Sequence, residues 1–308
     1  MEDVVLRTSR LSKRFGKTVA VDSLDLEIVR GEIFGLVGPN GAGKTTALNM
    51  ILGLLHPTSG EIELLGRRGR DLPAARLRVG AVVDNSGFLP YLSGRDNLDV
   101  FARTFGLYDR RQVDELLAQV GLADQAGVKY KAYSAGMRRR LALAACLVRD
   151  PELLLLDEPF NGLDPQGMHW LRQLLRTLAS DGKAIFFSSH WLSDVEDLCR
   201  RVLILDHGHT IKHGILKELL QDGQYIRARV VDPDRCLALL DGLPWIEHIE
   251  REHDWLVIKA PMEHSLDVSR ILAQGDQYLR ELLVTNISLE KYLVSITRES
   301  HDDGAVEL

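Results

Sequence analysis

Strand-like apolar runs alternate with amphipathic stretches over the first two thirds of the chain. The runs cover residues 32–37, 79–83, 153–156, 184–187 and 202–205. A continuous apolar run of this length is typical of a strand buried on both faces, and its alternation with helices is typical of βαβ units. We therefore expect an α/β domain built around a largely parallel sheet.

The pattern becomes helical between residues 94 and 148. Few strand-like runs occur there, and apolar side chains recur at spacings of three and four residues. The positions with this spacing are Leu98, Phe101, Val113, Leu116, Leu117 and Val120. We predict a mainly helical subdomain over about 94–148, inserted in a first domain that spans residues 1–221.

A further change of pattern at residue 222 predicts a second domain. Its strand-like segments are 225–231, the hairpin 246–259, and 279–284. Its segments with helical spacing are 234–240, 264–273 and 289–297. The sequence therefore predicts a small α+β domain over residues 222–308.

Composition narrows the class of protein. With 308 residues, 45% of them hydrophobic and 27% charged, the chain can bury the cores of two domains. Its formal net charge of −6 argues against nucleic acid as a partner, because phosphate backbones are bound by clustered basic residues. The first ten residues lack the apolar segment of a secretion signal, and the apolar runs are much shorter than the roughly 20 residues that cross a bilayer. We expect a cytoplasmic chain that does not span a membrane.

The cysteines predict no disulfide framework and no zinc site. There are three, Cys146, Cys199 and Cys236, and none forms a CxxC pair. Buried, reduced thiols are therefore expected.

A phosphate-binding loop follows the first buried run. Glycines let the backbone turn tightly and point N–H groups at phosphates, and the next helix presents its positive end to them. We expect Lys44 to pair with the β and γ phosphates, and Thr45 to place its hydroxyl on Mg²⁺. The sequence therefore predicts a site for ATP and Mg²⁺. The residues assigned to this site are Gly38, Pro39, Asn40, Gly41, Ala42, Gly43, Lys44, Thr45 and Thr46.

Two carboxylates come directly after the apolar run 153–156. In a parallel sheet the carboxyl ends of the strands meet at one edge, where ligands bind. Asp157 can hold Mg²⁺, directly or through water, and Glu158 can polarise the water that attacks the γ-phosphate. A third run, 184–187, brings His190 to the same edge, where it can sense the γ-phosphate. We predict catalytic roles for Lys44, Glu158 and His190.

The segment Tyr133, Ser134, Ala135, Gly136 and Met137 resembles the LSGGQ signature of the ATP-binding subunits of ABC transporters. The resemblance covers nearly the whole chain. It implies a P-loop NTPase fold with a RecA-like core, a β-rich N-terminal part and a helical subdomain. It also implies that two nucleotide domains pair head to tail, as a homodimer or a heterodimer. Ser134, Gly136 and Met137 of one chain would then contact the nucleotide held by the other.

The same resemblance assigns further positions. Phe15 would stack on adenine, and residues 161–165 would form a loop through which two paired sites communicate. Asp84 stands where most family members carry glutamine, and subunits that resemble peptide-antibiotic exporters often carry glutamate there. We assign Asp84 to the metal and to the attacking water, because hard oxygen donors suit Mg²⁺. Residues 85–98 would form a groove for a helix of the membrane partner, and residues 288–293 resemble a closing helix of export ATPases.

We therefore expect an ATP-hydrolysing subunit that powers a bacterial exporter of drugs, peptide antibiotics or similar cargo. Separate transmembrane subunits are its expected partners, and they would hold it at the inner face of the cell membrane. Three alternatives stay open. They are the ATPase of an importer, a soluble ABC ATPase that acts on ribosomes or DNA, and a regulatory module that closes on ATP with little turnover.

Overall fold

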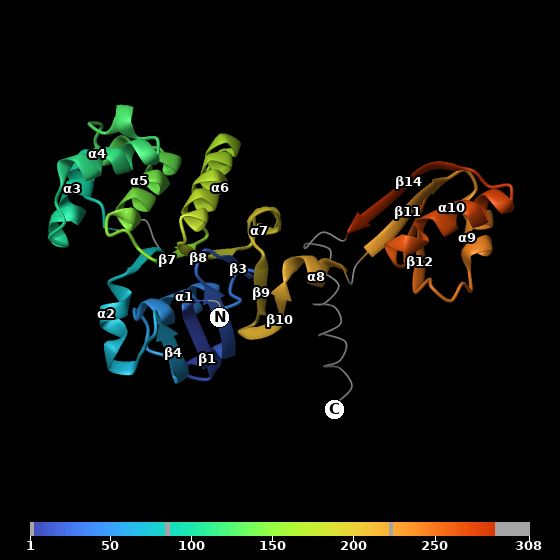
Figure 1. The fold of residues 1–308 in the computed structure, drawn as a ribbon, viewed down its shortest axis with the longest axis horizontal. Helices are drawn as coiled ribbons and strands as arrows, with labels where there is room; N and C mark the ends of the chain where they lie inside the picture. Colours follow the sequence, from blue (N-terminus) through green and yellow to red (C-terminus); the bar gives the residue numbers. More distant parts are fainter. Residues whose placement is uncertain (1–2, 84–86, 222–223, 287–308) are drawn as a thin grey trace. The chain divides into compact units, whose positions relative to one another are not determined.

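The computed structural model describes residues 3–83, 87–221 and 224–286 (Figure 1). It divides into two compact units, Met1–Gly214 and Ile215–Leu308, and each is described by itself. The predicted boundary at residue 221 stays a prediction. Among the described residues, no helix combines the length and apolarity needed to cross a membrane.

The N-terminal unit contains a six-stranded sheet. Its order is β10-β9-β3-β8-β7-β6, and the β9–β3, β3–β8, β8–β7 and β7–β6 pairs are parallel. Each strand predicted from an apolar run is present, so the α/β fold class is confirmed. The bounds are β3 Ile33–Val37, β6 Val79–Val82, β7 Leu153–Asp157, β8 Ala184–Ser189, β9 Arg201–Asp206 and β10 His209–Ile215.

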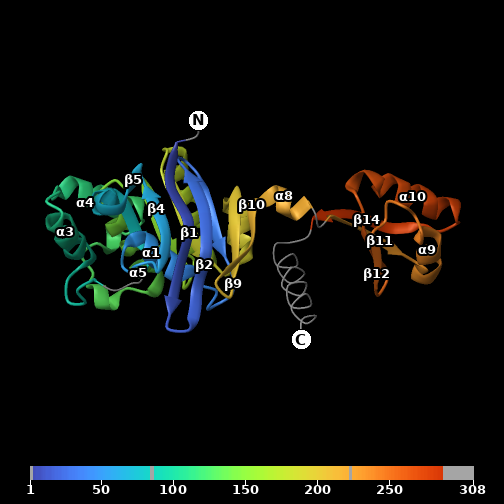
Figure 2. The ribbon, with the colours of Figure 1, turned by 90° about the horizontal axis from the view of Figure 1, so that it is seen from below.

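A second sheet has the order β2-β1-β4-β5, and its two long strands lie side by side in Figure 2. It supplies the β-rich N-terminal part. Helix α1 (Lys44–Leu52) buries Leu48 and Ile51 in one core with side chains from both sheets, so the start of α1 is held firmly. The strands are β1 Val4–Phe15, β2 Thr18–Val29, β4 Ser59–Leu64 and β5 Arg67–Arg68.

The helical subdomain is present where the sequence predicted it. Helix α3 (Gly94–Thr104) begins with a capping box in which Ser93 and Asp96 satisfy each other's backbone N–H groups. Helices α4 (Arg110–Gln119) and α5 (Ala135–Leu147) pack against it. The other helices of this unit are α2 Leu72–Arg76, α6 Pro165–Ser180 and α7 Leu192–Leu198, and the helix α8 Leu216–Gln221 follows β10.

The C-terminal unit is α+β, as predicted, with the element order βαββαβ. Its sheet has the order β12-β13-β11-β14 and its pairs are antiparallel, which is the ferredoxin-like arrangement. Buried side chains of α9 and α10, among them Leu240 and Leu272, share a core with Ile226 and Ile258 of the sheet. The bounds are β11 Gln224–Val230, α9 Pro233–Leu240, β12 His248–Glu252, β13 Trp255–Lys259, α10 Ser265–Gln274 and β14 Leu279–Asn286. The helix predicted over 289–297 lies outside the described residues.

Candidate site for nucleotide binding and hydrolysis

The predicted phosphate-binding loop joins β3 to α1. All five residues of β3 are buried, and α1 begins at Lys44 directly after Gly43, whose φ of 105° is in the left-handed region. A side chain at Gly43 would bring its Cβ within 2.3 Å of the Ala20 carbonyl oxygen, and one at Gly38 would bring it within 2.1 Å of the Leu205 carbonyl oxygen. The loop therefore needs glycine at both positions in order to lie this close to its neighbours.

The Lys44 ammonium lies at the centre of the loop. It donates to the carbonyl oxygens of Gly38 at 2.7 Å and Pro39 at 3.1 Å, and it lies 3.3 Å from a carboxylate oxygen of Glu158. Lys44 is only 6% exposed, so its charge is compensated by these partners rather than by water. An anion that enters the loop would meet a cation that is already in position.

Asp157 connects the end of β7 to the loop and to the next strand. One of its carboxylate oxygens accepts a hydrogen bond of 2.6 Å from the Thr45 hydroxyl, and the other accepts one from the Ser188 hydroxyl of β8. Its side chain is buried. The carboxylate and the Thr45 hydroxyl are hard oxygen donors within hydrogen-bond distance of each other, and these donors suit Mg²⁺.

Glu158 follows with a φ of 46°, in a region that residues other than glycine rarely occupy. Such a conformation costs about 1–3 kcal/mol and has to be held by its surroundings. Three backbone hydrogen bonds hold it here. The Glu158 N–H donates to the Ser188 hydroxyl at 2.9 Å, and its carbonyl accepts from the guanidinium of Arg139 at 3.1 Å and from the Asn161 N–H at 3.2 Å.

His190 contacts the other side of the Glu158 carboxylate. Its ring nitrogen Nδ1 lies 2.8 Å from Glu158 Oε2, and its backbone N–H donates to the same oxygen at 3.3 Å. The Glu158 carboxylate therefore lies between an ammonium and an imidazole. All three groups follow the carboxyl ends of parallel strands, the geometry that the sequence predicted.

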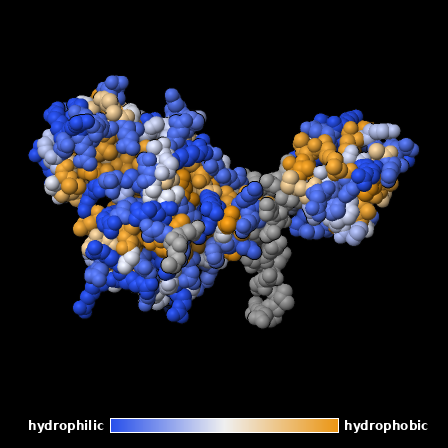
Figure 3. Space-filling view, viewed as in Figure 1, coloured by the Kyte–Doolittle hydropathy of each residue, from blue (hydrophilic) through white to orange (hydrophobic). Residues whose placement is uncertain are grey.

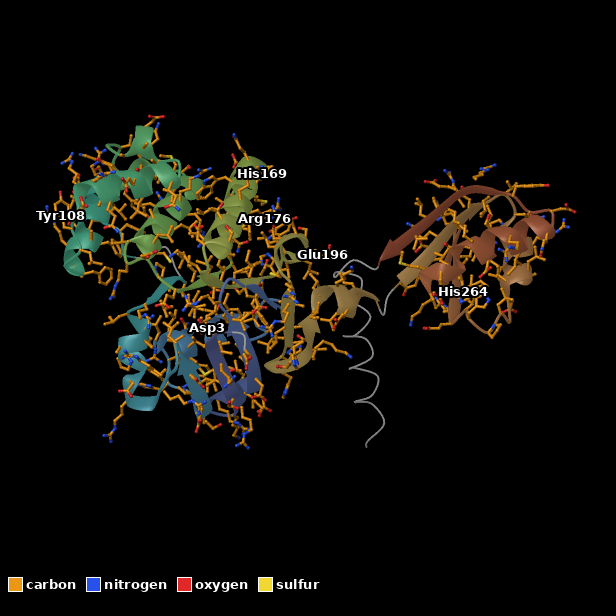
Figure 4. The ribbon with its side chains drawn as sticks, viewed as in Figure 1. Asp3, Tyr108, His169, Arg176, Glu196 and His264 are labelled. Atoms are coloured by element: carbon orange, nitrogen blue, oxygen red, sulfur yellow. The ribbon has the colours of Figure 1, made fainter. Side chains whose placement is uncertain are left out.

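The position of His190 depends on the helix that follows it. Asp194 of α7 is almost fully buried and pairs with the guanidinium of Arg172 on α6. One turn further along, Asp197 accepts from Arg176 at 2.7 Å. Figure 4 shows Arg176 on α6 and Glu196 on the neighbouring turn of α7. These ion pairs attach α7 to α6. They therefore hold the start of α7, and His190 just before it, beside the carboxyl ends of β7 and β8.

A cavity of about 220 Å³ opens over the loop. Its lining contains the predicted loop residues from Asn40 to Thr46 together with Ala20 and Glu158, whereas the predicted Gly38 and Pro39 do not line it. Sequence reasoning missed Ala20, and it assigned no role to Ser188 or Arg139. Ser188 ends an apolar run, which could have indicated it, whereas nothing in the sequence connects Arg139 with Glu158. The cavity is lined by Ala20, Asn40, Gly41, Ala42, Gly43, Lys44, Thr45, Thr46 and Glu158.

Other predicted site residues lie elsewhere in the chain. Phe15 is 51% exposed at the end of β1, with the Lys13 ammonium 5.1 Å from its ring centre, and it does not line the cavity. Ser134 caps α5 by accepting from the Met137 N–H at 3.2 Å, and Gly136 lies in the first turn of that helix. Ser134, Gly136 and Met137 do not line the cavity of their own chain. Asp84 lies outside the described residues.

A phosphate loop, a buried lysine and two strand-end carboxylates on a parallel sheet define a P-loop nucleotide-binding protein. The family model described as ABC transporter matches residues 21–161. An uncharacterized ABC transporter ATP-binding protein, YdbJ of Bacillus subtilis (strain 168), is 34% identical over 99% of both chains. The bacitracin transport ATP-binding protein BcrA of Bacillus licheniformis is 32% identical over 95% of this chain and 97% of its own.

Solved structures agree with this match. The cbiO1 protein of Clostridium perfringens, part of the ABC transporter complex cbiONQ, has a TM-score of 0.64 and 29% identity, and covers 71% of this chain and 91% of its own. The dimeric cassette MJ0796 bound to ADP and Pi has a TM-score of 0.62 and 26% identity over 68% of this chain and 98% of its own. The chain therefore belongs to the ATP-binding subunits of ABC transporters. It binds ATP, and its enzymatic activity is ATP hydrolysis.

Proposed function

We propose that this chain works as a pair and hydrolyses ATP to power an exporter of a drug, a peptide antibiotic or a similar cargo. The observation that carries the proposal is the arrangement around Glu158, whose carboxylate contacts both Lys44 and His190 at the mouth of the phosphate loop. The names of two relatives support transport, and one of them names export. One is BcrA, and the other is a Nod factor export ATP-binding protein of Cupriavidus metallidurans, 42% identical over 70% of this chain.

In the proposed mechanism, Glu158 polarises the attacking water and His190 orients its carboxylate. A γ-phosphate in the loop competes with Glu158 for the Lys44 ammonium, because the carboxylate lies only 3.3 Å from that ammonium. Transfer of Lys44 to the phosphate leaves Glu158 free to accept a proton from water. The loop N–H groups and Lys44 then stabilise the charge that develops on the phosphoryl oxygens.

Mg²⁺ is the proposed metal cofactor. The Thr45 hydroxyl and the Asp157 carboxylate are the two described groups that would hold it, directly or through water, while the phosphates complete its coordination. Bound Mg²⁺ would neutralise charge on the β and γ phosphates. We assign Asp84 to the same metal from the family resemblance.

A second nucleotide domain would complete the site. Ser134, Gly136 and Met137 lie at the start of α5, whose N-terminal backbone N–H groups and positive end suit an anion held by the other chain. The 51% exposure of Phe15 leaves its ring accessible to an adenine. We propose a head-to-tail pair in which Ser134, Gly136 and Met137 of each chain contact the nucleotide held by the other, in a homodimer or a heterodimer.

The transmembrane partner would dock on the helical subdomain. A cavity of about 290 Å³ lies between that subdomain and β6, and its lining includes Phe88, Phe101 and Phe105 together with Arg76 and Arg149. The Arg149 guanidinium lies 4.5 Å from the ring centre of Phe105. Figure 3 shows apolar residues gathered on the viewed face around the region that Figure 1 labels α3 and α5. We propose that this groove receives a helix of the membrane subunit at the cytoplasmic face.

The test is recovery of partners from native membranes. A tagged Glu158→Gln chain is incubated with ATP and detergent-solubilised membranes, and co-purifying proteins are identified by mass spectrometry. A polytopic membrane protein is expected, and its topology distinguishes exporter from importer. The matched control adds Phe101→Asp, which should lose that partner and keep ATP binding. Recovery of ribosomal or other soluble proteins alone would replace the transporter by a soluble ATPase.

A further inference from the structure

The sheet of the C-terminal unit has two edges of different character. The strand β12 ends the sheet on one side and β14 on the other. In β12 the three most exposed side chains, His248, Glu250 and Arg251, are all ionisable, and ionisable side chains protect a sheet edge from pairing with another strand. In β14 the exposed side chains are charged at Arg280 and Glu281 but apolar further along, at Leu283, which is 39% exposed, and Val284, which is 37% exposed. The two edges therefore differ in what prevents further strand pairing.

Leu283 and Val284 are neighbours in a strand, so their side chains point to opposite faces of the sheet. The register agrees with this, because Leu283 pairs with the half-exposed Arg227 and Val284 with the fully buried Ile226. A partner lying on one face would cover only one of the two apolar side chains. A strand that extends the sheet beside β14 covers both, and it also satisfies the outward backbone groups of β14, which pair with no other strand among the described residues. Figure 1 shows β14 as the long strand along the margin of this unit.

We propose that β14 pairs antiparallel with β14 of a second copy of this chain, with Leu283 at the centre of the pairing. Strand self-pairing of this kind has two-fold symmetry, so it closes at two copies and leaves no edge for a third. The proposal concerns the C-terminal unit and requires neither ATP nor a membrane subunit.

The register follows from the sequence of β14. With Leu283 opposite its own copy, Leu282 lies opposite position 284 of the second copy, and Glu281 lies opposite position 285. Apolar positions then face apolar positions, and no like charges are opposed. The ladder from Glu281 to Thr285 is also the regular part of β14, because a register shift precedes Glu281 on the β11 side. A centre one residue earlier would place Glu281 opposite Leu283.

Cysteine cross-linking tests the contact and its register together. Directly opposed residues in an antiparallel pair have Cα atoms about 4.5–5.5 Å apart, within disulfide reach. Leu283→Cys should therefore form a disulfide-linked dimer under mild oxidation. At position 281 the two copies would lie roughly 13 Å apart, too far for a bond. Glu281→Cys is thus the matched control, and Glu250→Cys on β12 is the second.

The native thiols should not interfere with this experiment. Cys146, Cys199 and Cys236 are all buried, and burial raises the pKa of the Cys146 thiol to about 12, so little thiolate forms at pH 8. A cross-linked dimer in the unmodified chain would have to be absent before the variants are compared.

The second measurement is the mass of the full-length, nucleotide-free chain by analytical ultracentrifugation. A dimer is expected. Leu283→Lys should halve its mass, because two opposed ammonium groups at an apolar centre repel each other, whereas Glu250→Lys should leave it unchanged. A nucleotide-free monomer, or equal cross-linking at 281 and 283, would overturn the proposal. A dimer that forms only after removal of residues 287–308 would also overturn it, since that segment would then be the occupant of the edge. ATPase activity and membrane-partner recovery are measured separately, so failure here leaves the proposed transport function intact.

Discussion

Two sheets of this chain, the largely parallel sheet of the N-terminal unit and the antiparallel sheet of the C-terminal unit, use charged side chains in opposite ways. In the parallel sheet, Asp157, Glu158 and His190 follow the ends of β7 and β8 and meet Lys44 at one edge. In the sheet of the C-terminal unit, charged strand residues instead pair one at a time with a charged residue of another strand or of a segment beside a strand. These pairs are Arg227–Glu252, Arg229–Asp254 and Lys259–Glu247.

Strand direction explains this difference. Parallel strands place all their carboxyl ends on one side, so polar residues that are far apart in sequence converge there. Antiparallel strands alternate direction, so their carboxyl ends do not meet at one edge, and charged side chains of this sheet form separate ion pairs instead. A reactive cluster therefore forms only in the N-terminal unit, among the residues that the structure describes.

Glu158→Gln should cause the largest effect on activity. Removal of the general base is expected to lower turnover by about 10²-fold or more while ATP binding is retained. The matched control is Glu252→Gln, which removes a paired carboxylate from the antiparallel sheet and should leave turnover unchanged. Steady-state phosphate release and nucleotide binding measure the two quantities. Equal turnover in wild type and Glu158→Gln would contradict the role given to Glu158.

Thr45→Ala should weaken the metal site. Loss of the hydroxyl is expected to raise the Mg²⁺ concentration needed for half-maximal turnover by roughly 10-fold or more. Thr45→Ser keeps the hydroxyl and should restore most of the affinity. Titration of ATPase activity with Mg²⁺, after removal of metal with EDTA, measures this. An unchanged Mg²⁺ requirement in Thr45→Ala would exclude Thr45 as a ligand.

Ser188→Ala should affect both stability and turnover. The hydroxyl contacts the Asp157 carboxylate and the Glu158 N–H, so its removal leaves buried groups unpaired at a cost of about 1–3 kcal/mol. We also expect turnover to fall by about tenfold, because the Glu158 N–H loses its hydrogen bond and the strained backbone is held less firmly. Ser189→Ala is the matched control. Its buried hydroxyl bonds with the Trp191 backbone instead, so stability should fall with a smaller loss of turnover.

Leu256→Ala should have the smallest effect on activity. Leu256 is fully buried in the C-terminal core, and the cavity left by this substitution is expected to destabilise that unit by roughly 2–5 kcal/mol. Hydrogen exchange should report the loss in β11 and β13, with unchanged protection in β3 and β7. Turnover equal to that of the wild type would support the assignment of catalysis to the N-terminal unit, and a matching loss of turnover would contradict it.

The parts of the fold that the sequence could predict also differ between the two units. Strands β3, β7 and β8 are buried on both faces and therefore appear as continuous apolar runs. The long strands β1 and β2 were not located one by one, because register shifts and the left-handed residues Arg10 and Ser23 interrupt their alternation. In the C-terminal unit the sequence predicts the strands β11 to β14 and the helices α9 and α10, but neither α8 nor the order of the strands in the sheet, because strand order depends on long-range pairing.

For the site, the residues next to a motif could be predicted and those that reach it from elsewhere could not. The P-loop is one continuous motif, and the two strand-end carboxylates are adjacent residues. The structure brings Lys44, Asp157, Glu158 and His190 together as expected. Arg139 contacts the Glu158 carbonyl from a helix 19 residues earlier in the chain, and a single sequence has no signal for such a contact. The roles of these residues remain predictions that the variants above test.

The hydrogen bond from Arg139 to the Glu158 carbonyl also has a mechanical consequence. A helix is a stiff rod that rises about 1.5 Å per residue, so the 13 residues of α5 span about 20 Å. The buried guanidinium fastens that rod, one turn from its first residue, to the strained peptide after β7. The start of α5 is therefore connected to the turn at Glu158, and a tilt of α5 would move the Glu158 backbone and with it the direction of the Glu158 carboxylate.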